Sequence, residues 1–333
     1  MDSTKRQDWL DIAKGILIIC VMMGHYGTVD DPPAIDQYLY WFHMPAFFII
    51  SGYLLKKPEN WESFLQFTKK RAYRLLVPYF SFLFVITGVR YIIEAGEHSL
   101  FFMAKDLAKL LYGGQLLSGL YAPFWFITCL FFAQVFFAFL VMKVKKDRYV
   151  IGLLAIFYIF SFAESAWFGK SGVPMPFNVD VSLIAMAYVG FGYYGRSFIN
   201  KLQAKHSIVL GLICLAMVLD NIHGRFNYEL DLKYNIYHTF GADLIVPIVF
   251  SLFVLTLSKA ISKLDDHGIL VTLGSASLTI MYLHVPLNII AYHYVHYGLL
   301  TFVVIGLAAS LLVSKGLLKP FTVTERVFMG VRK

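Results

Sequence analysis

The chain has 333 residues, of which 58% are hydrophobic and only 15% are charged. Soluble globular proteins carry about 25% charged residues, so this composition excludes an ordinary soluble domain and favours a polytopic, all-α integral membrane protein. The formal net charge of +8 would also suit a nucleic-acid-binding protein, but the placement of the basic residues explains it differently.

Ten segments are apolar and long enough to cross a bilayer, which takes roughly 17–25 residues. They cover residues 9–27, 37–55, 74–93, 121–142, 149–168, 182–200, 207–222, 239–261, 269–290 and 298–315. The stretch at 99–113 spaces its charges on one side, which predicts a helix lying at the membrane interface. The loops are too short to fold alone, so we expect residues 1–333 to form a single membrane-embedded domain.

The positive charges support this map. With the N-terminus in the cytoplasm, most of the 29 Lys and Arg residues fall in segments predicted to face the cytoplasm, such as Lys69–Arg71 and Lys143–Arg148. The opposite loops are mostly neutral or acidic. This alternation follows the positive-inside rule and predicts cytoplasmic N- and C-termini. It accounts for most of the net charge, so we expect no nucleic-acid partner.

The three cysteines, Cys20, Cys129 and Cys214, all lie inside apolar runs and lack metal-type spacing. The sequence therefore predicts neither a disulfide framework nor a metal site.

The first predicted helix carries Asp11, Lys14 and His25 within apolar sequence. Lys14 and His25 share one helical face, about 16 Å apart at ~1.5 Å per residue. An ionisable group inside a membrane indicates a functional site by default; the structural alternative is a Lys that snorkels and a His at the interface. Asp11 is near Lys14, and we expect the two to form a salt bridge.

A second basic motif lies at the cytoplasmic end of the third predicted helix. Arg71 and Arg74 are one turn apart and share a face. Their planar guanidinium groups suit bidentate phosphate binding. The alternative is that they only follow the positive-inside rule.

Four further residues are predicted in the outer half of the membrane or at its outer surface. His43 is near the outer end of the second helix, and His284 is at about the depth of His25 in the ninth. Trp125 is at the outer start of the fourth helix, and Asp243 is early in the eighth. Singly, each also suits a structural role, Trp125 as part of an aromatic belt.

Together these residues place histidines in the outer half of the membrane and basic groups towards the cytoplasm. A ligand with phosphates at the inner face and a reactive group ~15–20 Å deeper would match this spacing along a helix. Acyl-coenzyme A has that shape, with an anionic nucleotide at one end and a thioester at the other.

These motifs resemble the acyltransferase-3 family of membrane O-acyltransferases, and within it the fucose 4-O-acetylase-related branch. The resemblance spans almost the whole chain. It rests on the opening run Asp8–Ile16, the Lys14–His25 spacing, the run Phe42–Tyr53, Arg71-x-x-Arg74, and Gly-x-x-Ser-Leu-x-Ile-x-Tyr-Leu-His ending at His284.

The resemblance implies a ten-helix inner-membrane enzyme that moves acyl groups, usually acetyl, onto envelope or exported sugars. It implies that His25 is the catalytic histidine, that Lys14 is its basic partner on the first helix, and that Arg71 and Arg74 are the family's arginine pair. Many members carry Arg at the position of Lys14. Lys supplies a point charge rather than a fork, which argues against bidentate binding there.

Our hypothesis is an O-acetyltransferase whose co-substrate is acetyl-CoA, with the phosphates on Arg71, Arg74 and Lys14. His25 acts as general base on a sugar hydroxyl or takes the acetyl group itself. We expect the free or lipid-linked sugar to bind among His43, Trp125, Asp243 and His284, within a shell of membrane lipids.

Two questions stay open at this point. A carboxylate is expected to orient His25, and Asp243 is the best intramembrane candidate. The alternatives in function are a transporter or polysaccharide-export component without acyl transfer, which would also bury charged residues, and a relative that transfers succinyl groups.

Overall fold

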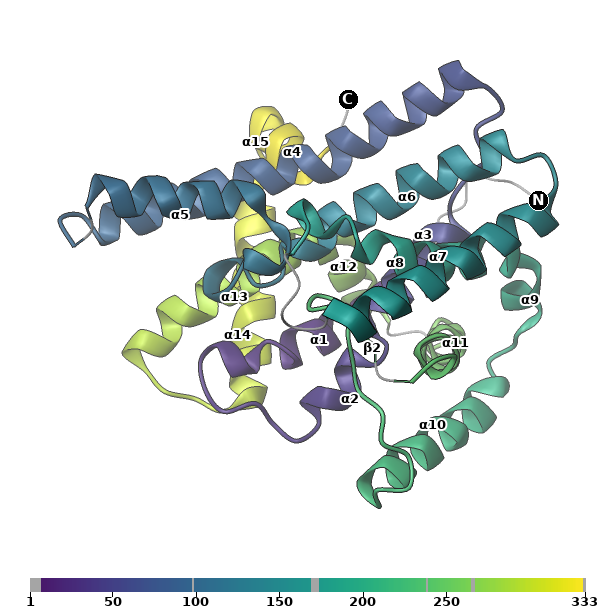
Figure 1. The fold of residues 1–333 in the computed structure, drawn as a ribbon. Coiled ribbons are helices and arrows are strands. Elements are labelled where there is room, and N and C mark those ends of the chain that lie inside the picture. Colours follow the sequence, from purple (N-terminus) through teal and green to yellow (C-terminus); the bar gives the residue numbers. More distant parts are fainter. Residues whose placement is uncertain (1–6, 98, 169–173, 238, 265–266, 332–333) are drawn as a thin grey trace.

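The computed structural model describes residues 7–97, 99–168, 174–237, 239–264 and 267–331. The first half of the chain forms α1 (Asp8–Met23), α2 (Asp36–Tyr40), α3 (His43–Tyr53), α4 (Trp61–Ile93), α5 (Leu100–Tyr112), α6 (Trp125–Lys143) and α7 (Asp147–Phe168). The second half forms α8 (Val181–Tyr194), α9 (Arg196–Lys201), α10 (His206–Ile222), α11 (Ala242–Ile261), α12 (Gly268–Ser275), α13 (Ser277–Tyr294), α14 (Leu299–Val313) and α15 (Thr322–Met329). The two strands β1 (Leu230–Asp231) and β2 (Ile236–Tyr237) pair as an antiparallel hairpin. The fold is therefore all-α in character, as predicted (Figure 1).

Six helical segments in the described part of the chain are long and apolar enough to cross a membrane. They are Asp8–Thr28, Trp61–Ile93, Gly119–Lys143, Asp147–Trp167, Ala242–Ile261 and Leu299–Leu318. Each overlaps a predicted span, although Trp61–Ile93 begins well before the predicted 74–93. The bent pair α12 and α13 makes a seventh if it is counted as one span. The count of ten spans and the cytoplasmic placement of the termini stay predictions.

The other predicted spans are helical but short or broken. The second, 37–55, is divided into α2 and α3, and Pro45 lies in the first turn of α3, where its missing N–H costs nothing. The sixth corresponds to α8 and α9, and the seventh to the 17-residue α10. In the ninth, α12 and α13 meet at an angle of 82°. The predicted interfacial stretch 99–113 is helical as α5.

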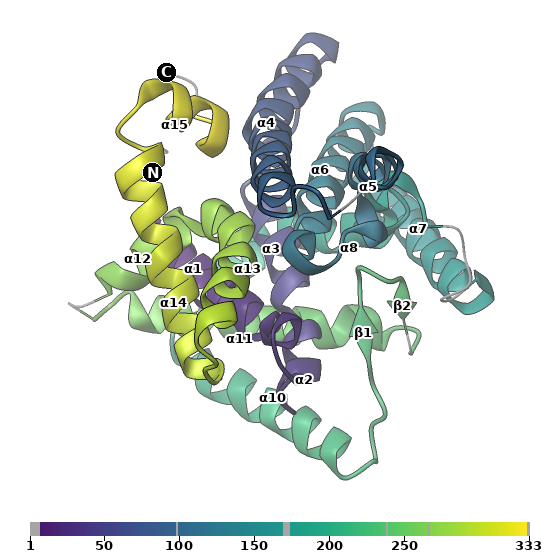
Figure 2. The same cartoon turned by 90° about the vertical axis from the view of Figure 1, so that its left-hand side faces the viewer.

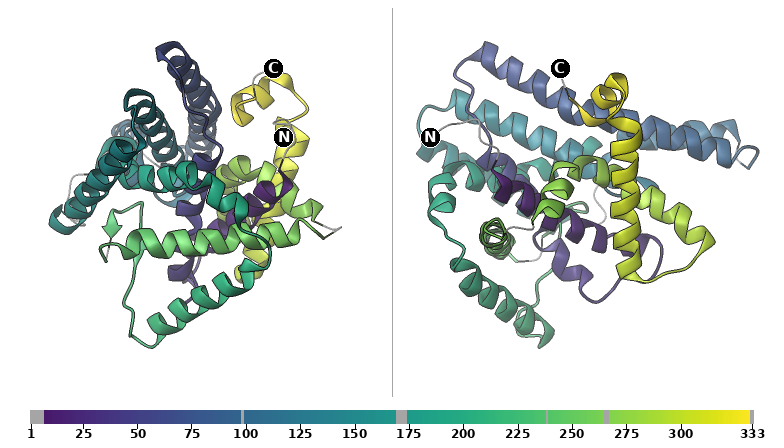
Figure 3. Two further views of the ribbon diagram at one scale, coloured as in Figure 1. Left: turned by 90° about the vertical axis from the view of Figure 1, so that its right-hand side faces the viewer. Right: turned by 180° about the vertical axis from the view of Figure 1, so that it is seen from behind.

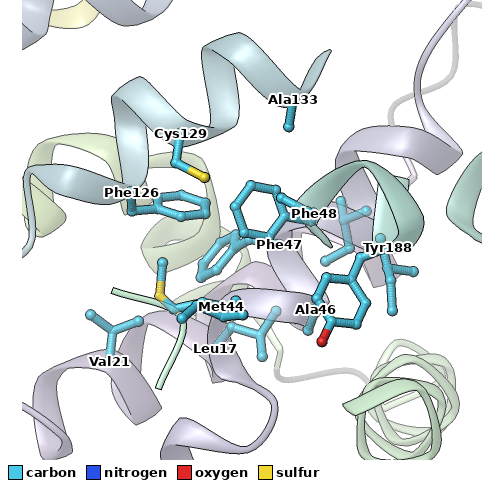
Figure 4. Close-up of a cluster of buried hydrophobic side chains, with 14 of the residues drawn as sticks. Leu17, Val21, Met44, Ala46, Phe47, Phe48, Phe126, Cys129, Ala133 and Tyr188 are labelled. Carbon is cyan, nitrogen blue, oxygen red and sulfur yellow. The ribbon is translucent and has the colours of Figure 1, made fainter. Parts of the chain in front are cut away.

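The centre of the fold is α1, which packs against α3, α11, α12, α13 and α14. Figure 4 shows the apolar core where α1, α3, α6 and α8 meet, with Leu17 and Val21 near Met44 and Phe47. The hairpin and α2 contact each other (Figure 2). At the C-terminus, α14 leads into α15, which packs on α4 (Figure 3).

The outward faces of several helices are apolar. Side chains such as Ile208, Leu212 and Ile222 on α10 and Ile156 and Phe160 on α7 are more than half exposed. Apolar surface of this extent marks contact with a membrane or a partner. Together with the six long apolar helices, it identifies an integral membrane protein.

Glycines allow two pairs of helices to approach at backbone distance. A Cβ at Gly52 of α3 would overlap the backbone carbonyl of Val189 on α8, and one at Gly192 would overlap that of Ile49. Likewise, Gly274 of α12 lies against the backbone of Asp11 on α1. Gly274 is therefore part of a helix-packing face, of the kind that small residues form in membrane proteins.

Gly52→Ala should destabilise the protein by about 1–3 kcal/mol, because the new methyl group meets backbone that cannot rotate away. The measurement is the thermal unfolding midpoint in detergent. Gly88→Ala on α4 is the matched control, since a Cβ there has nothing within 4 Å. An unchanged midpoint for Gly52→Ala would show that α3 and α8 are less closely packed than the structure indicates.

Candidate active site

The structure brings His25 and His284 together from helices far apart in the chain. His25 follows Gly24, the C-cap of α1, and His284 is on α13. Their ring centroids are 5.0 Å apart, and His284 Nε2 is 3.3 Å from His25 Nδ1. His284 is fully buried behind His25.

The backbone around the two rings fixes which nitrogens carry protons. A carbonyl oxygen can only accept a hydrogen bond. His284 Nδ1 therefore donates to the Ile280 carbonyl, 2.8 Å away, which leaves Nε2 as an acceptor. His25 Nδ1 donates to the Val21 carbonyl at 2.7 Å and points at His284 Nε2 as well. The unprotonated nitrogen of a neutral His25 is consequently Nε2.

A cavity of about 520 Å³ lies beside His25, a size typical of small-molecule sites. Predicted residues His43 and Trp125 also line it. His43 is buried, and its Nδ1 donates to the Leu39 carbonyl, so its Nε2 can accept a hydrogen bond from a ligand. The cavity borders the apolar core through Val21 and Met44.

The same cavity is lined by charged residues that our sequence analysis missed: Asp36 of α2, Asp231 of β1 and Lys233 of the hairpin. Burial, helped by the nearby charge of Asp231, raises the pKa of Asp36 to about 6. Burial lowers the pKa of Lys233 to about 8, although the opposite charge of Asp231 works against this shift. The only signal in the sequence was that they are charged residues outside the apolar segments.

Asp243 is placed elsewhere. It is fully buried on α11, and its backbone carbonyl accepts a hydrogen bond from the Tyr188 hydroxyl. Among described residues, those lining the His25 cavity do not include Asp243. We expected a carboxylate to orient His25, whereas the side chain that contacts its Nδ1 is a histidine, His284.

Lys14 forms the predicted salt bridge with Asp11, which is confirmed at 2.6 Å. The Lys14 side chain is one-quarter exposed, and that of Asp11 is buried. Part of the Lys14 charge is therefore balanced locally.

The arginine pair lies on α4, whose first turn is fixed by a capping box between Asn60 and Ser63. The Arg71 guanidinium is 5.2 Å from the ring centroid of Phe67. Arg74 lines a second cavity, of about 620 Å³, with Gln66, Lys69, Lys70, Gly330 and Val331.

Gly330 closes one wall of this second cavity. It has a left-handed backbone with φ +62°, and a Cβ there would be 2.7 Å from the Arg74 carbonyl oxygen. A glycine is needed for both reasons. The segment after α15 and the basic face of α4 thus form one basic cavity.

The helix α13 contacts both the His25 site and α4. His284 contacts His25, and two residues earlier the Tyr282 hydroxyl is 3.5 Å from the carbonyl of Leu75, the residue after Arg74. Tyr282 also stacks on Phe82 of α4 at 4.7 Å. A half-buried histidine at one cavity can act as a base, and the cluster of cations at the other can bind an anionic group.

Comparison with known proteins agrees with this class of site. The sequence model of the acyltransferase-3 family, described as an acyltransferase domain, matches residues 7–318. The chain therefore belongs to this family.

Two curated relatives are both named Nodulation protein NolL. The one from Mesorhizobium japonicum is 32% identical over 161 residues, which is 45% of this chain and 40% of the relative. The one from Sinorhizobium fredii is 38% identical over 85 residues, 23% of each chain. The alignments thus span less than half of these relatives. No solved structure matches the chain.

Proposed function

We propose that this protein is an inner-membrane O-acetyltransferase that moves the acetyl group of acetyl-CoA to a hydroxyl of an envelope or exported sugar. The observation that carries the proposal is His25: its Nδ1 is held by the Val21 carbonyl and His284, which leaves Nε2 as the basic nitrogen of a residue that lines a cavity.

In the proposed reaction, His25 Nε2 removes the proton from the sugar hydroxyl as the oxygen attacks the thioester carbonyl. The tetrahedral intermediate collapses with cleavage of the carbon–sulfur bond. The departing thiolate takes the proton back from the imidazolium, so the products are an acetyl ester and free CoA. The imidazolium is stabilised at Nδ1 by the Val21 carbonyl and by His284 Nε2.

The phosphates of acetyl-CoA would bind at the second cavity. Lys69, Lys70 and Arg74 supply its cations, and Arg71 on α4 and the partly balanced Lys14 on α1 would add to them. The rise of an α-helix, ~1.5 Å per residue, puts Lys14 about 16 Å from His25, a distance that the pantetheine arm can span.

The test is to incubate the purified protein in nanodiscs with radiolabelled acetyl-CoA and envelope glycan. We expect label on sugar. Label that stays on the protein when sugar is left out would support the acetyl-histidine route. A parallel incubation uses radiolabelled succinyl-CoA, and label on sugar from this donor alone would indicate the succinyl-transferring alternative. Absence of label on sugar and protein with both donors would favour the transporter.

Arg74→Ala should raise the KM for acetyl-CoA about tenfold, because a charge-assisted hydrogen bond to phosphate contributes roughly 1.5–3 kcal/mol. Arg148→Ala is the control: Arg148 is also basic and predicted to be cytoplasmic, but it is exposed at the start of α7. The measurement is the KM for each substrate. An effect confined to the sugar acceptor would contradict the phosphate role.

A further inference from the structure

The wall of the His25 cavity has more negative than positive charges. Its described lining includes the carboxylates of Asp36 and Asp231 and the ammonium of Lys233. With its histidines neutral, the wall has one net negative charge. A sugar that enters this cavity therefore meets more carboxylate than cation.

The ammonium group of Lys233 already has partners within the protein. The Lys233 side chain is buried, with 7% of the residue exposed, and its Nζ donates to the Leu117 carbonyl at 2.5 Å. Its charge is 4.9 Å from the centroid of the Tyr234 ring. Asp231 Oδ1 accepts the backbone N–H groups of Lys233 and Tyr234, at 2.9 and 3.4 Å. Both side chains thus have partners within the protein.

Asp36 differs from both. Its Oδ1 is shielded from solvent and has no hydrogen-bond partner among the described residues. That oxygen lies over Gly24, where an added Cβ would be 3.2 Å from it, and Gly24 directly precedes His25. Burying a carboxylate oxygen without a donor is costly. Asp36 also lines the cavity, so a hydroxyl bound there can donate a hydrogen bond to the carboxylate.

Buried polar contacts hold the hairpin wall rigid. Asn178 donates to the Lys233 carbonyl at 2.8 Å, Asn235 donates to Asp180 at 2.5 Å, and Ser165 donates to the Asn235 carbonyl at 2.5 Å. The carboxylate of Asp231 is therefore fixed in position opposite α2 before any ligand binds, as a specificity site requires.

We propose that Asp36 determines acceptor specificity: it accepts a hydrogen bond from a second hydroxyl of the sugar whose neighbouring hydroxyl faces His25, and with Asp231 it excludes anionic sugars. The acceptor class is thus a neutral sugar unit with adjacent hydroxyls, rather than a uronic or sialic acid. This inference rests on the proposed acetyl transfer at His25.

The experiment compares two matched acceptors, methyl galactoside and methyl galacturonide, in the purified protein with labelled acetyl-CoA. For the unmodified protein we expect kcat/KM at least tenfold higher for the neutral sugar, since like charges in a buried site repel strongly. Asp36→Asn should raise the KM for the galactoside about tenfold, leave the KM for acetyl-CoA unchanged, and narrow the preference between the two sugars.

The stability of Asp36→Asn separates this role from a structural one. The folded state raises the pKa of Asp36 to about 6, above the ordinary value near 4. Its ionisation therefore destabilises the fold above about pH 6, and this cost disappears below about pH 4. Asn removes the cost, so the unfolding midpoint at pH 7.5 should rise, whereas losing a structural carboxylate would lower it.

Asp31→Asn removes the same charge from an exposed position close to Asp36 in the chain and should leave the preference unchanged. Two results would overturn the inference without contradicting acetyl transfer at His25. They are equal kcat/KM values for the two sugars in the unmodified protein, or an unaltered KM for the galactoside in Asp36→Asn. Absence of transfer to either glycoside and to envelope glycan would overturn the proposed function, and the inference with it.

Discussion

His25→Ala should lower the rate of acetyl transfer by a factor of ~10²–10⁴, the contribution typical of a positioned general base. The proposed reaction needs Nε2 of this ring to take the proton from the sugar, and after the substitution His284 is still buried behind the empty space. The measurement is the initial rate of label transfer from acetyl-CoA to glycan. The circular dichroism spectrum and the elution volume in detergent should stay those of the unmodified protein.

The control for this substitution is His223→Ala. His223 makes the same kind of local bond, from Nδ1 to the Leu219 carbonyl four residues earlier, but on an exposed helix end. It should retain full activity. A well-folded His25→Ala protein with full activity would remove His25 from catalysis.

Added imidazole offers a second test of the same role. His25→Ala enlarges the cavity at the position of the missing ring, so free imidazole can bind there and act as the base. Partial recovery of the rate with imidazole would support base catalysis. Recovery of activity with neutral, non-basic ring compounds would instead point to a space-filling role for the side chain.

The long apolar helices could be predicted from sequence because each one forms its backbone hydrogen bonds within a single apolar run. The prediction of continuous helices was less accurate where packing against other helices determines whether a helix continues or bends. The predicted span 269–290 suggested one continuous helix, but the chain turns between α12 and α13, where Gly274 lies against the α1 backbone. A hydropathy pattern contains no information on such a crossing.

The candidate site was predictable only in part, for a similar reason. His25, His43, Trp125 and His284 stand out because polar or amphipathic side chains are rare in apolar runs, and the structure places the first three on one cavity and the fourth behind His25. Asp36 directly precedes the second predicted span, in a polar stretch where a charge is unremarkable. Its place on the cavity depends on how α2 packs against Gly24.

His284→Ala should lower kcat about a hundredfold and leave the KM for acetyl-CoA unchanged, which marks a positioning role. His284 fixes the protonated nitrogen of His25 and accepts a hydrogen bond from it at 3.3 Å; without this acceptor the ring can rotate. A displacement of about 1 Å in a reacting group can cost ~10²-fold.

The conservative variant His284→Gln tests whether the acceptor or only the bulk of the side chain matters. A glutamine carbonyl oxygen can accept from His25 Nδ1, whereas His284→Phe fills the space without an acceptor. We expect Gln to recover part of kcat and Phe to behave like Ala. Equal activity of Gln and Phe would mean that His284 supports His25 by packing alone, and that the Val21 carbonyl by itself orients the base.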